Sequence, residues 1–257
     1  FKIMSSTADE AAQPLLGKMA RSCGCEDAPE APTLVSRLTM EFVGTFFLVL
    51  TVFLCVVQQE PLGGLAIGTI LGVMIFAGGH ISGGHYNPAV TIAVITSGAT
   101  RTKFAAPGAG PVATMAAAYI LTQCFAGIIA AAIGFGLTGE IFTPGPNAKY
   151  GAGQALCAEI LFTFALASIV LNVATSKAAC PNHYYGYAIG LLVFVGASAV
   201  GNISAAVFNP AVGTGITMMS VFVGGSATNL WIYWLGPGIG GALAAGVFRL
   251  MNPTEYK

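Results

Sequence analysis

Apolar residues in this chain gather into long runs separated by short polar segments. Six of the runs approach the roughly 20 residues that an α-helix needs to cross a bilayer. They cover about 38–58, 62–79, 112–135, 152–174, 184–201 and 227–249. Two shorter runs, about 88–98 and 210–221, each begin at a Pro-Ala pair, and proline suits the first turn of a helix. The pattern predicts an all-α membrane protein with six transmembrane helices and two re-entrant half-helices.

The segments that flank these runs differ in composition. Residues 1–37 are polar and mixed in charge and contain three prolines, which predicts a disordered tail. A membrane domain then covers 38–250, and 251–257 form a short C-terminal segment. Cys23 and Cys25 in the tail lack a second cysteine pair, which favours an incidental pair over a metal site.

Composition narrows the possible classes of function. Only 8% of the residues are charged, and the mean hydropathy is +0.78, whereas a soluble domain carries about 25% charge. The 34 glycines fit a bundle whose membrane helices approach closely. The net charge is zero and the basic residues form no stripe, which argues against nucleic-acid binding. No nucleophile–base set or metal-ligand cluster is recognisable, so we expect neither an enzyme nor a metal or cofactor site.

The chain consists of two related halves, about 38–135 and 152–250. Asn87-Pro88-Ala89 returns as Asn209-Pro210-Ala211, separated by 122 positions, and the residues before each triplet also match. Upstream, Glu41 and Glu159 begin two similar apolar stretches. Such duplication in an apolar chain favours a channel or transporter whose site lies where the halves meet.

The distribution of charge predicts the orientation in the membrane. With six spans both termini share one side, which carries Lys2, Lys18, Arg21, Arg37, Arg101, Lys103, Lys177, Arg249 and Lys257. The other side has only Lys149, so both termini are expected to be cytoplasmic. Three spans per half give the halves opposite topology. The two half-helices therefore enter from opposite sides, and their N-termini meet near the midplane.

This meeting point predicts a chemistry for the two asparagines. Each half-helix directs its positive dipole end at the membrane centre, where Asn87 and Asn209 would cap the helix through their side-chain oxygens. Their amide groups then stay free as donors. Two donors beside two positive dipole ends suit an uncharged oxygen acceptor such as water and repel cations.

Over about residues 38–250 the sequence resembles the aquaporin and glycerol-facilitator family, the major intrinsic proteins. The segment from His80 to Thr91 is very similar to the family's first pore loop, and Leu230 to Pro237 resembles its last helix. The resemblance implies a pore in each subunit, a homotetramer in a lipid bilayer and passive conduction without a cofactor.

Counting from the two motifs locates the family's four selectivity-filter positions at Ile67, Ala197, Ala206 and Val212. Val212 stands where an arginine is common, and the ring resembles that of some plant vacuolar-membrane members. A wider, apolar constriction predicts conduction of water with glycerol, urea or ammonia. Tyr233-Trp234 instead resembles the water-channel pattern, and Gly213 replaces an aspartate typical of glycerol facilitators. A strict water channel is therefore the alternative.

The resemblance also suggests roles for the remaining buried polar residues. Carboxylates at membrane depth are costly, and in the family such glutamates as Glu41 and Glu159 hold the loops before the Asn-Pro-Ala turns. His85 is expected to support the first loop, while His80 is a candidate for lining the cytoplasmic half of the pore.

Two further functions remain open. A junctional or scaffolding protein with a vestigial pore would not need the intact Asn87 and Asn209. An ion channel or coupled transporter would need charged groups along the path, and only Glu41 and Glu159 are available. Both the plasma membrane and a vacuolar or other internal membrane are possible locations.

Overall fold

The computed structural model describes residues 32–98, 112–179 and 181–256. The chain divides into two units, Phe1–Thr33 and Leu34–Lys257, and the second contains every helix described below. Residues 1–31 of the predicted tail lie outside the described residues. Helix α2 begins at Leu34, within the range predicted as tail, and buries Arg37 on the side that packs into the bundle.

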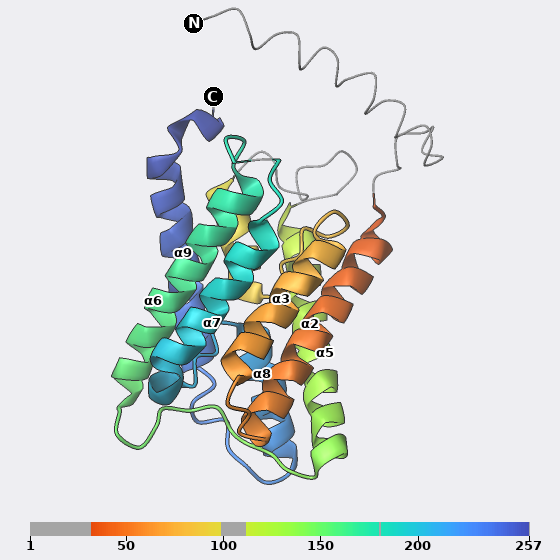
Figure 1. Cartoon of the computed structure of the whole chain (residues 1–257), viewed down its shortest axis with the longest axis vertical. Coiled ribbons are helices and arrows are strands. Elements are labelled where there is room, and N and C mark those ends of the chain that lie inside the picture. Colours follow the sequence, from red (N-terminus) through yellow and green to blue (C-terminus); the bar gives the residue numbers. More distant parts are fainter. Residues whose placement is uncertain (1–31, 99–111, 180, 257) are drawn as a thin grey trace, which may run out of the picture. The chain divides into compact units, whose positions relative to one another are not determined.

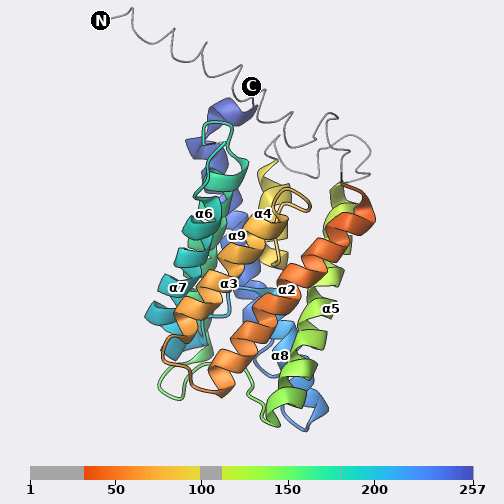
Figure 2. The same ribbon diagram turned by 45° about the vertical axis from the view of Figure 1, so that its right-hand side comes forward.

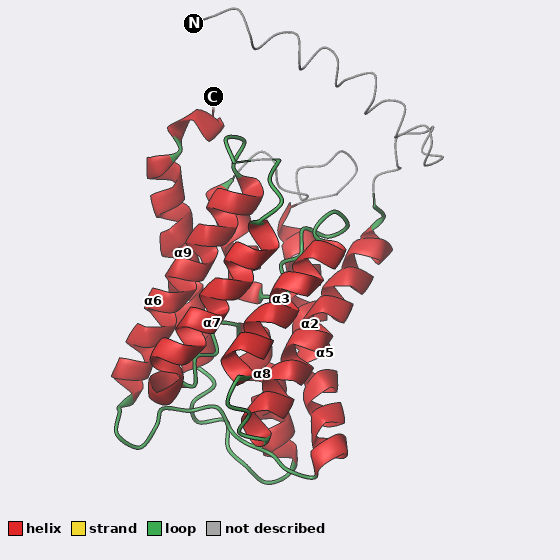
Figure 3. Ribbon diagram, in the orientation of Figure 1, coloured by secondary structure: helices red, strands yellow, loops and turns green. Residues whose placement is uncertain are grey.

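The described part of Leu34–Lys257 consists of helices and loops without strands (Figure 3). The long helices are α2 (Leu34–Val57), α3 (Gly63–Gly78), α5 (Val112–Thr138), α6 (Ala152–Val170), α7 (Tyr185–Ser204) and α9 (Ile232–Met251). The two short ones, α4 (Pro88–Ser97) and α8 (Pro210–Phe222), start at the two Pro-Ala pairs. The predicted set of six spans and two half-helices is confirmed.

The bounds differ from the prediction mainly at α9. The apolar run begins near 227, but the helix begins at Ile232, because residues 227–231 form turns in which Ala227 O and Asn229 O accept from Leu230 and Ile232. Helix α6 continues into a single π-helical turn, Leu171–Thr175, and a 3-10 turn, Pro253–Tyr256, follows α9. π-Helical turns are rare and occur frequently at functional sites.

Helix contacts repeat between the two halves. Helix α2 packs against α5 as α6 packs against α9, and α5 packs against α8 as α9 packs against α4. Helices α3 and α7, which correspond to each other, pack together in the middle of the bundle (Figure 1). The turned view of Figure 2 brings the half-helix α4 into sight beside α9. Corresponding helices of the two halves therefore make corresponding contacts, as an inverted repeat requires.

Glycine makes the closest of these approaches possible. A Cβ atom on Gly68 of α3 would lie 2.4 Å from the carbonyl oxygen of Gly190 in α7, and one on Gly190 would lie 2.3 Å from Gly68 O. Likewise, a Cβ on Gly127 of α5 would lie 2.5 Å from Ala211 O in α8. Small residues at such crossings let membrane helices gain contact along their backbones.

Candidate functional site

Each half-helix is capped by the asparagine of its motif. Asn87 and Asn209 have extended backbones, with φ of −158° and −146°, and proline follows as the first helical residue. Asn87 Oδ1 accepts from the N–H of Ala89 at 2.8 Å, and Asn209 Oδ1 accepts from Ala211 at 2.9 Å. These bonds satisfy one otherwise unpaired donor at each helix start.

The amide nitrogens of the two caps reach across to the opposite half. Asn87 Nδ2 donates to Phe208 O at 2.9 Å, and Asn209 Nδ2 donates to Tyr86 O at 2.8 Å. Each acceptor is the residue just before the other asparagine. The sequence argument left the whole amide free, whereas here one of its two N–H groups joins the two loops. One N–H per asparagine remains for a solute.

Both loops are held by buried glutamates. Glu41 Oε1 accepts from Ser82 Oγ at 2.6 Å and from the N–H of His85 at 3.0 Å, and its Oε2 accepts from Tyr86 N and from Gln123 Nε2. The glutamate is 0% exposed. Four donors on two oxygens compensate for removing the carboxylate from water.

The second loop repeats this arrangement around Glu159, also 0% exposed. Its Oε1 accepts from Ser204 Oγ at 2.7 Å and from Val207 N at 2.9 Å, and its Oε2 accepts from Phe208 N at 2.7 Å. Both loops contain non-glycine residues with positive φ, among them Tyr86 at 47° and Phe208 at 51°. Such strained backbone persists only where its surroundings hold it firmly.

The two predicted histidines occupy different surroundings. His85 is buried, its Nδ1 lies 3.1 Å from Thr91 Oγ1, and it is among the residues that line the central cavity. His80 is exposed and is not among the lining residues, because α3 has already ended at Gly78 and the chain turns there.

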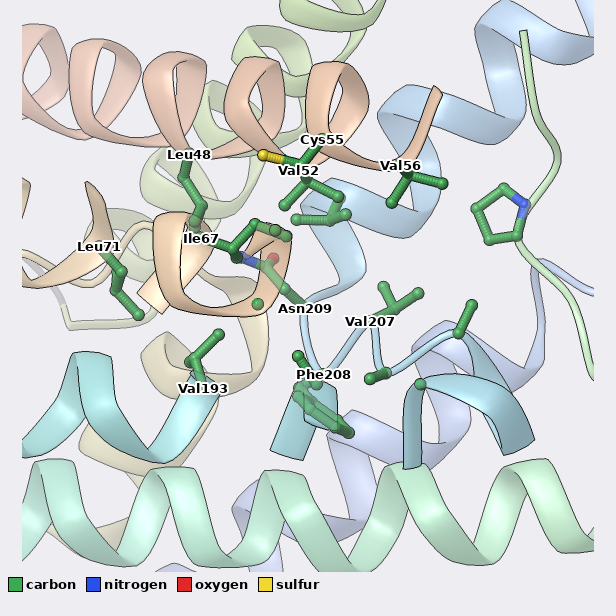
Figure 4. A pocket seen from close by; sticks show the side chains of 18 of the residues that line it. Leu48, Val52, Cys55, Val56, Ile67, Leu71, Val193, Val207, Phe208 and Asn209 are labelled. Atoms are coloured by element: carbon green, nitrogen blue, oxygen red, sulfur yellow. The ribbon is translucent and has the colours of Figure 1, made fainter. Parts of the chain in front are cut away.

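A cavity of about 610 Å³ lies inside the bundle and reaches both asparagines. All four predicted filter positions line it, namely Ile67, Ala197, Ala206 and Val212. Figure 4 shows how apolar side chains of α2, α3 and α7 project around it, with the Asn209 amide among them. At one mouth it is edged by polar residues, which are Gln59, Glu60, Thr143, Ser198 and Asn202.

Sequence reasoning missed much of the apolar wall. Leu48 and Val52 of α2 line the cavity, as do Leu166 and Val170 of α6. A signal for them exists: each pair lies seven and eleven positions after the buried glutamate of its own helix, and these spacings keep residues on one helix face. The glutamate that anchors each pore loop thus lies on the same helix face as the residues of the cavity wall.

The wall has few groups that could bind an ion. Among the lining residues of the described part of the chain, Glu60 is the one carboxylate, and no lysine or arginine is present. Val212, 3% exposed, belongs to a cluster of buried apolar residues. The arrangement combines uncharged hydrogen-bond donors at the asparagines with apolar wall residues, besides His85 and the polar residues at one mouth. It can pass small neutral molecules but provides no replacement for an ion's hydration shell.

Six spanning helices around two capped half-helices, with a cavity that reaches both caps, define a passive membrane channel. Residues 54–248 match the family described as Major intrinsic protein, and the chain belongs to this family. Its members are non-enzymatic membrane channels for water and small neutral solutes, so the chain is an integral, multi-pass channel of that kind.

The chain is similar to relatives whose names indicate different functions. It is 37% identical over 195 residues to "Probable aquaporin TIP4-1" of Oryza sativa subsp. japonica, covering 74% of this chain and 72% of that protein. It is 35% identical over 226 residues to "Glycerol uptake facilitator protein-like 6" of Lactiplantibacillus plantarum, covering 84% and 97%. The X-ray structure of the aquaglyceroporin from Plasmodium falciparum shares the fold, with a TM-score of 0.73 at 17% identity over 87% of this chain and 99% of that one.

Proposed function

We propose that this channel conducts water together with small neutral solutes such as glycerol, urea or ammonia. The observation that carries the proposal is the apolar ring of Ile67, Ala197, Ala206 and Val212 on a single cavity. Two alanines leave room there, and Val212 brings neither the five donors nor the fixed charge of an arginine. A ring of this kind selects by size more than by hydrogen bonding.

The asparagines supply the barrier to cations in this proposal. Each half-helix directs about half a positive elementary charge toward the caps, and the remaining amide N–H groups of Asn87 and Asn209 donate to a passing oxygen. In the same scheme Glu41, Glu159 and His85 keep the loops in place, and they take no part in proton transfer. Glu41 accepts from the N–H of His85, Glu159 accepts from the N–H of Phe208, and His85 Nδ1 lies within hydrogen-bond distance of Thr91 Oγ1, which supports a holding role.

A strict water channel is the alternative, suggested by Tyr233-Trp234 and by Gly213. None of the three residues lines the cavity. Gly213 packs against Tyr233, since a Cβ atom on Gly213 would lie 2.7 Å from Tyr233 Cβ. The absence of aspartate at 213 is thus explained by packing next to a buried tyrosine, and it carries little weight about the solute.

Light scattering from proteoliposomes after an osmotic jump tests the proposal. Fast shrinkage in sucrose followed by fast re-swelling in glycerol is the expected result. Fast shrinkage without re-swelling would contradict the broad range and leave a water channel. Shrinkage no faster than in empty liposomes would favour a scaffolding protein, and an ion current would favour an ion channel.

We further propose a homotetramer with both termini in the cytoplasm, in the plasma membrane or a vacuolar-type membrane. Orientation is supported by Arg37, Lys177 and Arg249, which belong to the end of the bundle where α2 begins and α9 ends, while Lys149 belongs to the other. The arginine-free ring, which resembles that of some plant vacuolar-membrane members, supports the vacuolar type. Light scattering of the detergent-solubilised protein, coupled to size exclusion, measures the subunit number, and protease protection in sealed vesicles reports the side of each terminus.

A further inference from the structure

One acidic residue lies at the polar mouth of the cavity. Glu60 is exposed and also belongs to the cavity wall, so it lies where the cavity meets solvent. It stands in the turn 58–62 between α2 and α3, and its neighbours Gln59 and Pro61 line the cavity as well. A solute that uses this mouth therefore passes Glu60 before it reaches the asparagines.

Hydrogen bonds of the turn fix the place of this charge. The N–H of Glu60 donates to Cys55 O, and the N–H of Gly63 donates to Glu60 O, both at 2.9 Å. Glu60 Oε1 accepts from the N–H of Leu62 at 3.2 Å, immediately before α3 begins. The partial positive charge of a helix start also attracts a carboxylate. The side chain is therefore held within the turn that forms part of the mouth.

No basic residue offsets the carboxylate inside the cavity. The wall contains neither lysine nor arginine among the residues that the structure describes, and Glu60 is its one carboxylate. Lys149, in the connection between α5 and α6, is exposed and does not line the cavity. Glu60 therefore gives this mouth a negative charge.

The asparagine caps discriminate against only one sign of charge. Two helix N-termini that repel cations attract anions, and N–H groups at helix starts are common anion ligands in proteins. The apolar wall opposes ions of both signs, because it does not replace their hydration shell. For an anion, the attraction of the caps offsets part of this cost. A barrier specific to anions must therefore lie elsewhere on the path.

We propose that Glu60 is a specificity-determining residue that excludes small anions, such as chloride, before they reach the caps. Its charge repels an anion at the mouth and leaves neutral solutes free to enter. The two barriers complement each other, since Asn87 and Asn209 act on cations at the midplane. One charged mouth suffices, because an anion that crosses the channel must pass both ends. The inference rests on the proposed function and supplies the anion part of its selectivity.

The test separates the charge of Glu60 from its hydrogen bond. Glu60→Gln removes the charge but keeps an oxygen that accepts from the N–H of Leu62, whereas Glu60→Ala removes both. The matched control is Glu140→Gln. Glu140 is exposed and does not line the cavity, although residues 142–145 of the same connection do.

Chloride uptake into proteoliposomes is the measurement. A chloride-sensitive dye inside the vesicles reports the uptake, and valinomycin lets potassium accompany the anion so that charge balances. The rate above that of empty liposomes is divided by the osmotic water permeability of the same vesicles. This ratio corrects for differences in the amount of active channel.

In Glu60→Gln we expect the ratio to rise about tenfold, the low end of the effect of a charged cleft on local ion concentration. Glu140→Gln should match the wild-type chain. A ratio in Glu60→Gln no higher than in the wild-type chain would overturn the proposal. A rise in Glu60→Ala alone would assign the effect to the structure of the turn, and an equal rise in Glu140→Gln would assign it to surface charge in general. Either result also contradicts the proposal.

Ionic strength provides a second readout that a structural role of Glu60 would not change. The Debye length falls from about 30 Å at 0.01 M to about 3 Å at 1 M salt. Added salt of a large organic anion should therefore raise the chloride ratio of the wild-type chain and leave that of Glu60→Gln level. Equal dependence on salt in both proteins would contradict an electrostatic barrier.

Failure of the proposed solute range is distinguishable from failure of this inference. Glycerol does not enter the chloride measurement, so a chain that conducts water alone still permits the comparison. Melting temperatures of Glu60→Gln and the wild-type chain in detergent are compared as well. Equal values show that faster chloride uptake does not come from a damaged fold.

Discussion

Asn87 and Asn209 hold each other's loops: the side-chain amide of each donates to the backbone carbonyl that immediately precedes the other, at 2.9 and 2.8 Å. The same two side chains cap their own half-helices through Oδ1. Each asparagine is therefore a bridge between the halves of the chain as well as a cap. The same two side chains therefore stabilise the meeting point of the half-helices and supply its hydrogen-bond donors.

Replacing Asn87 by alanine should destabilise the channel by about 2–4 kcal/mol. The helix cap accounts for about 1 kcal/mol, and the rest comes from the lost cross-loop bond and from Phe208 O, which is left buried without its donor. Thermal unfolding in detergent measures the change. Asn202→Ala is the matched control, because this exposed asparagine at the end of α7 should leave the melting temperature within the error of the wild-type value.

Glu159→Gln should also be strongly destabilising. Both oxygens of Glu159 accept from donors, so an amide NH2 in place of one oxygen must face the N–H of Phe208 or the donors of Ser204 and Val207. The expected loss is about 2–4 kcal/mol. The control is Glu140→Gln, on an exposed side chain between α5 and α6. An equal melting temperature for the two variants would show that the carboxylate does not hold the loop.

The sequence predicts best those features that depend on residues adjacent in the chain. The caps at Asn87 and Asn209 and the starts of α4 and α8 depend on three consecutive residues, so the motif suffices to predict them. The cross-loop bonds of the same asparagines depend on which carbonyl the other half places nearby. That information lies more than a hundred positions away and exists only in the folded bundle.

The pore wall illustrates the same distinction. The four filter positions were located by counting from the motifs, and all four line the cavity. His80, a candidate by its place in the motif segment, is exposed and is not among the residues that line this cavity. Glu255 is a charged residue close to the end of the sequence, where exposure is the usual state. Its burial results from a serine and a loop that the chain passes much earlier.

Gly68→Ala should disturb the packing of α3 against α7. The added Cβ would lie 2.4 Å from Gly190 O, which belongs to the backbone and cannot rotate away, so the two helices must separate. Overpacking of this kind costs about 1–3 kcal/mol. Gly246→Ala in α9 is the control, because a Cβ there meets no atom within 4 Å and alanine favours helix. Melting temperatures should fall in the first variant and stay level or rise in the second.

Val212→Arg should convert the pore toward water alone. The side chain would enter the apolar ring with five donors and a permanent charge, narrowing the lumen opposite Ile67 and the two alanines. Glycerol re-swelling of proteoliposomes should fall about tenfold, which corresponds to roughly 1.4 kcal/mol on the barrier. Water shrinkage should change much less, because a water molecule is smaller and is a good acceptor for the new donors.

A valine-to-arginine change outside the cavity tests whether the loss of glycerol permeability in Val212→Arg comes from the pore or from adding an arginine anywhere in the protein. Val223 caps the other end of α8, is 40% exposed and does not line the cavity. Val223→Arg should therefore leave glycerol and water permeabilities as they are in the wild-type chain. If Val212→Arg conducts glycerol as fast as Val223→Arg does, the narrowest part of the pore lies elsewhere. The apolar ring then cannot be the reason for a broad solute range.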